Sequence, residues 1–597
     1  MKRIEDGTRG EARGSGLWGT GRGGRGSDGR RNQAVRRGIL LLLVLALAAP
    51  LAASAGSGQK HSWASSYLAP SLQRAATQTP NANVPVIVQS TDGTGDAVDA
   101  LHDFSGTTRK LTIVGAAAGE VVARDLPALA EEHNLVITPD QTMVFDAKPE
   151  APKGNGPKPW KPSGNPHQNG PFSSTEVWPE AVGVDQLWPY LPGANARDGR
   201  STPTIAFVDS GIDATRSDFG NRVLAAVDLT TLPGNSPGDG RGHGTIVAGL
   251  AAGSAPGHAG ASPTAGIVSL DVMDDQGMAR TSDVIAAAQW ILKNREAYDI
   301  RVANFSLHAA SPSSFRWDPL DKAVEKLWLS GVVVVAAAGN QGQGSQPTPM
   351  AYAPANDPFV MTVGALDLHG SANPEHTDAT PWSAWGYTLD GFAKPELAAP
   401  GRAIVGPIPA GSTLAAERPG QVVRTREGTY ITLSGTSLSA PVVAGIAADL
   451  LALRPGLTPD QVKGALMHEA RSLRKVRTLA AGVGDAYAPD AASLAFPPNP
   501  NRALDNFLIE DPDGDGMIFD DVSWFDVAKS SAAWDAVSWL DGWADVSWSD
   551  VSWSDVSWSD VSWADVSWSD VSWSDVSWTD VSWADVARAV YGDVGPS

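Results

Sequence analysis

The chain has 597 residues, enough for several domains and for a full-size buried core. It contains no cysteine, which excludes disulfide bonds, thiolate metal sites and a cysteine nucleophile. The formal net charge is −21, and residues 505–597 hold 20 acidic against 2 basic residues, so no basic patch points to a nucleic-acid partner.

The N-terminal segment has the layout of an export signal. Basic residues, among them Arg36 and Arg37, precede an apolar run over residues 39–49 that is too short to span a bilayer. The small residues Ala53–Ala55 follow, a pattern that a signal peptidase accepts. We therefore predict a signal peptide over residues 1–55 and secretion of the remainder. An uncleaved membrane anchor is the alternative.

Residues 84–146 are predicted to form a small α/β unit. Apolar runs with the character of strands begin at Val84 and Lys110, and a helical segment follows at Leu126. The composition then changes to proline, glycine and lysine, which predicts a linker over residues 147–176.

Residues 177–496 alternate short apolar strands with amphipathic helices, the pattern of a mainly parallel sheet with helices on both faces. The predicted strands are TIAFVDSG, GIVSLDVM, VANFSL, GVVVVAAAGN and VMTVGA. In such sheets functional groups gather at the carboxyl ends of the strands, where Asp209, Ser306 and Asn340 lie. The predicted fold class is therefore α/β.

Three residues stand in sequence surroundings that suit catalysis by a serine nucleophile. Ser437 opens an apolar helical segment, so its hydroxyl lies at the positive end of a helix dipole. His243 stands between two glycines at the start of another predicted helix, and Asp209 ends a buried strand. A serine hydroxyl needs a neighbouring base, and the base needs a carboxylate that fixes its tautomer. Taken singly, Ser437 could instead be an ordinary helix cap and Asp209 a structural aspartate that caps a turn, and His243 could be structural or merely exposed.

The strings VDSGID, GHGTIVAG and SGTSLSAP around these residues, in the order Asp, His, Ser, resemble those of the subtilases, the peptidase S8 family. The strings NFSL, APANDPFVMTVGA and KPELAAPG resemble family sequences in the same order, so the resemblance extends over residues 177–496. It implies a subtilisin-like fold and hydrolysis of peptide bonds through an acyl-enzyme at Ser437. His243 would act as base and then as acid, with Asp209 as its orienting carboxylate.

The resemblance also assigns roles to residues around this triad. Asn340 would supply the side-chain donor of the oxyanion hole, although taken alone it could be a turn asparagine. Ser306 and Leu307 match positions that line the substrate, which would pair with this segment as an added strand. The substrates would be proteins or peptides. No cofactor would be required for the chemistry, and structural Ca²⁺ is compatible with the family, with its ligands unknown.

The layout of the chain resembles that of subtilase precursors. In that family a compact α/β propeptide between the signal peptide and the protease assists folding and then inhibits the enzyme. We therefore expect residues 84–146 to be an inhibitory propeptide, a partner of the chain's own protease domain. An unrelated accessory domain is the alternative.

Two departures from the family pattern flank the predicted site. His308 and Ala309 stand where many subtilases have glycines, which predicts a narrower substrate cleft. Arg216 and Ser217 stand where the family usually has His-Pro, and the sequence alone assigns no consequence to that change.

The C-terminal region begins with residues 497–540, which we interpret as an acidic linker. Its string DPDGDG at residues 511–516 has part of the spacing of a calcium loop, but the twelfth position is Val522, so an acidic turn is the preferred interpretation. Over residues 541–597 the unit D-V-S-W-x repeats every five residues. A helix would scatter these tryptophans around its axis and a strand would alternate them between its faces.

Two structures remain open for this repeat tail, a solenoid or an extended, partly disordered segment. The regular aromatic residues suggest contact with a cell surface, a polymer or a protein partner. The sequence thus favours a secreted serine endopeptidase that is made as an inactive precursor. The alternative is a surface- or polymer-binding protein that acts through its tail and carries a vestigial protease domain. A lipase or esterase is disfavoured because Ser437 does not stand in a G-x-S-x-G elbow.

Overall fold

The computed structural model describes residues 66–131, 134–144, 167–169, 171–193, 201–473, 476, 479–511 and 516–528. The predicted signal peptide, residues 1–55, and the repeat tail, residues 541–597, lie outside the described residues.

An eight-stranded sheet forms the centre of the peptidase region. Its strand order is β10-β13-β9-β15-β16-β17-β18, and β21 also pairs with β17. All of these pairs are parallel except β17 with β18, so the sheet is mainly parallel, as the sequence predicts. The strands span β9 Thr204–Asp209, β10 Val223–Asp228, β13 Gly266–Asp271, β15 Ile300–Phe305, β16 Val333–Ala337, β17 Met361–Asp367, β18 Asp378–Ala379 and β21 Leu397–Pro400.

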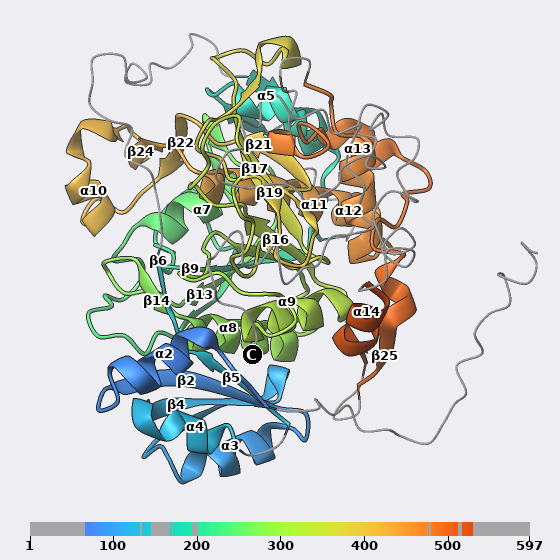
Figure 1. Cartoon of the computed structure of the whole chain (residues 1–597). Helices are drawn as coiled ribbons and strands as arrows, with labels where there is room; N and C mark the ends of the chain where they lie inside the picture. Colours follow the sequence, from blue (N-terminus) through green and yellow to red (C-terminus); the bar gives the residue numbers. More distant parts are fainter. Residues whose placement is uncertain are drawn as a thin grey trace, which may run out of the picture. The chain divides into compact units, whose positions relative to one another are not determined.

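Helices cover both faces of this sheet (Figure 1). Two of them, α8 and α9, pack against each other, and α7 packs against α11, which crosses β15, β16 and β17. They span α7 His243–Ala252, α8 Thr281–Asn294, α9 Pro319–Leu329 and α11 Thr436–Leu453. Helix α11 is long and apolar enough to cross a membrane, but 94% of it is buried within the protein. It is therefore the core helix of this domain.

The chain order reverses at β9. From β9 the chain continues to β10 and β13 on one side of it, and then to β15, β16 and β17 on the other. The carboxyl ends of β9 and β15 are neighbours, since Val208 pairs with Phe305. Ligands of α/β sheets bind at such a reversal point. Asp209, the last residue of β9, and Ser306, which follows β15, both lie there.

A separate five-stranded sheet, in the order β1-β5-β2-β4-β3, belongs to the N-terminal unit. Its elements are β1 Tyr67–Leu68, α2 Pro70–Gln78, β2 Asn83–Ser90, α3 Thr94–His102, β3 Thr108–Leu111, β4 Ala116–Val122, α4 Leu126–Leu129 and β5 Leu135–Pro139. The unit begins before the predicted boundary at residue 84, because β1 pairs with β5 and Leu72 of α2 is buried. A two-residue strand has no periodicity that a sequence could reveal.

Residues 504–511 and 516–528 are structured, which differs from the linker predicted over residues 497–540. Strand β25 Leu508–Glu510 pairs with β26 Met517–Phe519, and α14 spans Asp521–Ala528. Phe519 and Trp524 are buried in the same core as the main sheet. Burial of these two aromatic side chains stabilises the segment in spite of its acidic composition.

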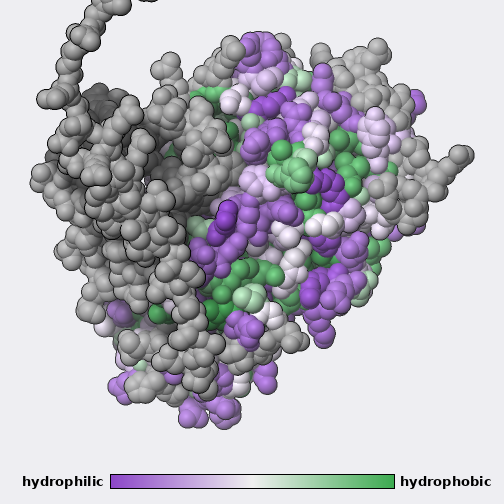
Figure 2. Space-filling model, turned by 90° about the vertical axis from the view of Figure 1, so that its right-hand side faces the viewer, coloured by the Kyte–Doolittle hydropathy of each residue, from purple (hydrophilic) through white to green (hydrophobic). Residues whose placement is uncertain are grey.

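The predicted linker over residues 147–176 also contains short strands, β7 His167–Asn169 and β8 Phe172–Ser174. The remaining elements of the peptidase region include α5 Trp178–Val182, α6 Val184–Leu187, β14 Met278–Arg280, β22 Ile404–Pro407, α10 Thr413–Glu417, β23 Val422–Arg424, β24 Thr429–Leu433, α12 Pro459–His468 and α13 Ala488–Ser493. Figure 2 looks onto the side that carries α12, α13 and α14, where hydrophilic and hydrophobic residues are mixed.

Candidate active site

Asp209 and His243 are brought together by β9 and α7. Asp209 is the last residue of β9, and His243 is the first residue of α7. Oδ1 of Asp209 lies 2.6 Å from Nδ1 of His243, and the two residues are 1% and 0% exposed. The backbone N–H of Ser210 also donates to this oxygen, at 2.8 Å. The pair thus has the geometry in which a buried carboxylate orients the imidazole through its Nδ1.

Gly244 permits the close approach of α7 to β9. A Cβ at this position would lie 2.0 Å from the carbonyl oxygen of Gly211 and 3.3 Å from Cβ of Asp209. The N–H of Gly244 donates to Oγ of Ser210 at 2.9 Å. Any side chain on residue 244 would therefore push the helix that carries His243 away from the strand that carries Asp209.

Asp239, a functional residue that the sequence motifs do not reveal, fixes the start of α7. Its carboxylate accepts four hydrogen bonds, from the N–H of Gly242, the hydroxyl of Ser210, and the N–H and hydroxyl of Thr245. Burial raises the pKa of Asp239 to about 8, and these hydrogen bonds oppose the rise. Two of these donors are backbone N–H groups and one is the hydroxyl of the distant Ser210, so no motif recognised in the sequence marks Asp239.

Ser437 is the second residue of α11 and is 4% exposed. Ser306 fixes the first turn of α11, because its hydroxyl donates to the carbonyl oxygen of Ser437 at 2.9 Å. Nδ2 of Asn304 in turn donates to Oγ of Ser306 at 2.9 Å. The hydroxyl of Ser306 therefore connects the end of β15 to the first turn of α11.

Asn340 follows β16 and is attached to the same turn. Its Oδ1 accepts the N–H of Thr436 at 2.9 Å and the hydroxyl of Thr436 at 3.2 Å, which fixes the orientation of the amide. A Cβ on Gly435 would lie 3.0 Å from Oγ of Ser437 and 3.6 Å from Nδ2 of Asn340. Gly435 therefore leaves open the space between a hydroxyl and an amide donor, where a reacting oxygen could lie.

The predicted substrate segment continues from Ser306 to Ala309. Leu307 is 2% exposed, so its side chain belongs to the core, and only its backbone could pair with a substrate. The side chain of His308 is half-buried, and its Nδ1 lies 2.8 Å from the carbonyl oxygen of Ala309. The centre of its ring lies 5.6 Å from the centre of the Tyr352 ring. The N–H of Ala309 donates to the carbonyl oxygen of Ala353 at 2.8 Å, which joins this segment to the loop that precedes β17.

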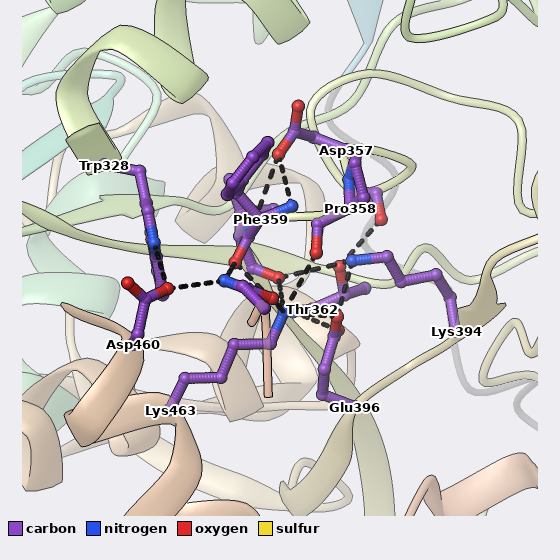
Figure 3. Close-up of polar contacts among 12 residues, drawn as sticks. Trp328, Asp357, Pro358, Phe359, Thr362, Lys394, Glu396, Asp460 and Lys463 are labelled. Atoms are coloured by element: carbon purple, nitrogen blue, oxygen red, sulfur yellow. Dashed lines mark hydrogen bonds and ion pairs between the residues drawn. The ribbon is translucent and has the colours of Figure 1, made fainter. Parts of the chain in front are cut away.

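A buried ion network holds the end of that loop (Figure 3). Nζ of Lys463, on α12, lies 3.0 Å from Oε1 of Glu396, and Nζ of Lys394 donates to the same oxygen at 2.7 Å. All three side chains are fully buried. Lys463 also donates to three consecutive carbonyl oxygens, at 3.0, 3.0 and 3.2 Å, of Pro358, Phe359 and Val360. Burial lowers the pKa of Lys463 to about 8.

Arg216, one of the two departures from the family pattern, has structural partners. Its Nε donates to Oδ2 of Asp218 at 3.0 Å and its Nη1 to the carbonyl oxygen of Ile408 at 3.1 Å. The hydroxyl of Tyr430 donates to the other oxygen of Asp218 at 2.7 Å. Arg216 therefore connects the turn after β9 with the segment that follows β22.

Within the described ranges, no group of three His, Asp or Glu side chains is arranged to hold a metal ion. Residues 512–515 of the string DPDGDG lie outside those ranges. Asp511, which precedes them, forms an ion pair with Lys326 of α9. No ligand of a structural Ca²⁺ ion can therefore be assigned from these residues.

Comparison with known proteins gives consistent results. A family model described as the subtilase family matches residues 200–493. Serine protease AprX of Bacillus subtilis (strain 168) is 34% identical over 272 residues, which cover 44% of this chain and 60% of AprX. Subtilisin DY of Bacillus licheniformis is 31% identical over 271 residues, which cover 45% of this chain and 84% of that subtilisin. The chain thus spans less than two thirds of the length of AprX.

A solved structure gives the same result for the fold. The crystal structure of fervidolysin from Fervidobacterium pennivorans, described as a keratinolytic enzyme related to subtilisin, superposes with a TM-score of 0.53 at 23% identity. The match covers 70% of this chain and 62% of fervidolysin. At this identity the match supports the fold alone, and the fold is the subtilisin-like α/β arrangement predicted from the sequence. On the evidence of sequence and fold together, the chain belongs to the subtilase family.

Proposed function

We propose that the protein is a secreted serine endopeptidase that is made as an inactive precursor. The observation that carries this proposal is the buried contact of 2.6 Å between Asp209 and His243. It lies at the start of α7, which packs against α11, the helix whose first turn carries Ser437. A serine hydroxyl is activated when an imidazole takes its proton and a carboxylate orients that imidazole.

In the proposed mechanism, Oγ of Ser437 attacks the carbonyl carbon of the scissile peptide bond while His243 takes the hydroxyl proton. Asp209 keeps Nδ1 of His243 protonated, so that Nε2 is the basic atom, and stabilises the imidazolium that forms. When the tetrahedral intermediate collapses, the C–N bond breaks and His243 gives the proton to the leaving amine. Water then attacks the acyl-enzyme by the same route and regenerates Ser437.

The oxyanion of the tetrahedral intermediate would lie in the space that Gly435 leaves open. Nδ2 of Asn340 and the backbone N–H of Ser437 are its donors. The amide of Asn340 is fixed by Thr436 before any substrate arrives, so little reorganisation is needed. Preorganised donors of this kind stabilise the transition state more than the ground state.

The substrate would be an extended stretch of a protein or peptide. Its backbone would pair beside Ser306 and the backbone of Leu307, and its side chains would point alternately into and out of the cleft. His308 and Tyr352 would narrow one end of this cleft.

We also propose that the N-terminal unit is the inhibitor of this protease. Strand β6, Thr142–Val144, pairs antiparallel with β14, and Met143 is buried in the peptidase core. Oε1 of Gln141 accepts the N–H of Ser311 at 2.8 Å, two residues after Ala309. β6 thus covers β14, and Gln141, just before β6, contacts the segment that continues from the proposed substrate position at Ser306 and Leu307.

The N-terminal unit is also attached to the first turn of α8. Oδ1 and Oδ2 of Asp140 accept the N–H and the hydroxyl of Ser282 at 2.8 and 2.7 Å. Arg109 forms an ion pair with Asp283 in the same turn. A carboxylate at a helix N-terminus interacts favourably with the helix dipole, and the unfilled N–H groups there need acceptors. These contacts would hold the unit over the cleft until it is cleaved.

The test is a comparison of the full chain with its Ser437→Ala variant. The wild type is expected to lose its N-terminal unit, measured by intact mass, and to hydrolyse an unfolded protein substrate. Ser437→Ala should remain full-length and inert. Ser439→Ala, two residues further along the same helix, is the matched control and should behave as the wild type. Equal behaviour of wild type and Ser437→Ala would instead favour a surface- or polymer-binding protein with a vestigial protease domain.

A further inference from the structure

The first DVSW unit of the chain, Asp521–Trp524, precedes the repeat tail and opens α14. Trp524 is 1% exposed and lies in an aromatic pocket. Its ring stacks on Phe392 at 5.5 Å and meets Phe315 edge-on at 5.2 Å, with Phe519 at 6.2 Å. This unit of the repeat is therefore a bound element of the peptidase domain.

The acidic residue of the unit faces basic groups of the same domain. Asp521 is 4% exposed, and its Oδ2 lies 3.9 Å from Nε of Arg316. Burial lowers the pKa of Lys322, but neighbouring carboxylates, first Glu325 and then Asp521, raise it overall. We call the set of Phe315, Phe392, Phe519, Arg316 and Lys322 the DVSW pocket.

The geometry of the helix explains which residues of the DVSW unit contact the pocket. Asp521 and Trp524 are three residues apart, so they lie on one face of α14, the face that meets the pocket. Ser523 is exposed, and its N–H and hydroxyl donate to Asp520 at 2.9 and 2.5 Å, which caps the helix. The pocket therefore contacts an aspartate and a tryptophan at the spacing D-x-x-W.

The tail carries the same contact residues many times. The string DVSW recurs at eight positions, which begin at residues 545, 550, 555, 560, 565, 570, 575 and 580. The last of these reads DVSWADVA and matches DVSWFDVA at residues 521–528 at seven of eight positions. Each unit is preceded by Ala, Ser or Thr, and Ser and Thr can cap a helix as Asp520 does.

We propose that the DVSW pocket is a binding site for the DVSW units of residues 545–583 of the same chain, which enter it when the first unit is displaced. Residues 525–544 connect the first unit to the next, and the cost of closing a loop rises only slowly with its length. Because the units are tethered to the pocket, their effective concentration is high. The peptidase domain thereby holds its acidic tail through interchangeable units.

One residue makes the first unit the preferred occupant. The ring of Phe525 lies 3.6 Å from the guanidinium carbon of Arg316, a cation–π contact. The tail units have Ala, Ser or Thr in its place. Tail units therefore bind more weakly than Asp521–Trp524, and exchange becomes visible once that unit is weakened.

The test uses the full chain in an inactive Ser437→Ala background, which prevents self-digestion. Trp524→Ala is compared in the natural tail and in a silenced tail, in which the eight tail tryptophans, at residues 548, 553, 558, 563, 568, 573, 578 and 583, are replaced by alanine. With the natural tail, Trp524→Ala is expected to lower the Tm by less than half as much as it does with the silenced tail, because a unit of the natural tail fills the pocket. Silencing the tail should leave the Tm unchanged while Trp524 is present.

An equal loss of Tm in the two tails would overturn the proposal. The proposal would also be overturned if the higher Tm with the natural tail depended on protein concentration, because the pocket would then hold a unit from a second copy of the chain. A second measurement adds a peptide with the sequence of residues 560–569, DVSWADVSWS, to the silenced Trp524→Ala variant. The peptide should raise the Tm, and its tryptophan-to-alanine version should not. If Trp524→Ala does not fold, Asp521→Asn replaces it in both comparisons, with smaller shifts of the same sign.

Discussion

Nδ1 of His243 lies 2.6 Å from Oδ1 of Asp209, and neither side chain is more than 1% exposed. This contact joins the end of β9 to the start of α7 and, in the proposed mechanism, selects the tautomer of the imidazole. We make five predictions, which concern this pair, Asn340, the contact of the N-terminal unit with α8, and the buried ion network around Lys463.

Asp209→Asn should keep the fold and lose the activity. An amide at this position favours the wrong tautomer of His243, and the loss in kcat is expected to be about 10⁴-fold. The measurement is kcat on a peptide substrate, with thermal unfolding as the check on folding. Asp213→Asn, a nearby half-buried carboxylate that binds Thr215, is the control and should retain its activity. A fully active Asp209→Asn enzyme would contradict the assignment.

Asn340→Ala should lower kcat by about 10²–10³-fold and leave KM nearly unchanged, because the lost donor acts on the oxyanion of the transition state. The alanine also removes the acceptor for the N–H of Thr436. Thr436→Val tests the hydroxyl part of this anchoring, since it removes the hydroxyl bonds to Gly339 and Asn340 and keeps the N–H that donates to Asn340. If Thr436→Val reduced kcat as much as Asn340→Ala, Asn340 would be a structural residue of the turn.

Asp140→Asn should release the N-terminal unit sooner. The change removes the negative charge that interacts with the first turn of α8, and hydrogen bonds to charged groups contribute about 1.5–3 kcal/mol. The time at which hydrolysis of a fluorogenic peptide begins after refolding measures the effect. Asp103→Asn alters an acid of the same unit whose side chain is 85% exposed, and it should leave this time unchanged. A later onset in Asp140→Asn would contradict the inhibitory role.

Lys463→Met should destabilise the protein by about 3–5 kcal/mol, because it breaks a buried ion network and leaves carbonyl oxygens without a donor. Urea unfolding measures the change, and Lys293→Met, an exposed lysine of α8, is the control. No more than 1 kcal/mol of destabilisation would show that the network contributes little.

The same network predicts a pH dependence. The pKa of Lys463 is about 8 in the folded protein and 10.5 in an unperturbed lysine. Between these values the unfolded chain binds more protons, so this group makes stability rise with pH from 8 to 10.5. The difference in stability between wild type and Lys463→Met should therefore grow over this range. A constant difference would contradict the lowered pKa.

The sequence predicts the central sheet well because buried parallel strands are continuous apolar runs. β9, β13 and β16 lie within the predicted strings, and β15 and β17 each extend two residues beyond theirs. β10 was not predicted, since its residues alternate between half-buried and exposed and three of its six residues are small or acidic. β1 was also missed, because its pairing with β5 connects segments far apart in the chain.

The triad residues can be found from the sequence because their flanking strings are specific, whereas the residues that position them cannot. Asp239 and Thr436 each act through a hydrogen bond to a partner that the fold brings close, Ser210 for Asp239 and Asn340 for Thr436. Trp524 falls in the linker predicted from the sequence because its surroundings are acidic and repetitive. Its burial depends on Phe315 and Phe392, which lie more than a hundred residues away in the sequence.

Labelling with a fluorophosphonate tests the central claim most directly. The protein freed of its N-terminal unit is treated with the reagent, and the adduct is located by peptide mapping. The proposed mechanism predicts a single phosphonylated residue, Ser437, and loss of labelling in Asp209→Asn and in the unprocessed precursor. A folded, processed protein in which Ser437 remains unlabelled would contradict the assignment of this chain as a serine endopeptidase.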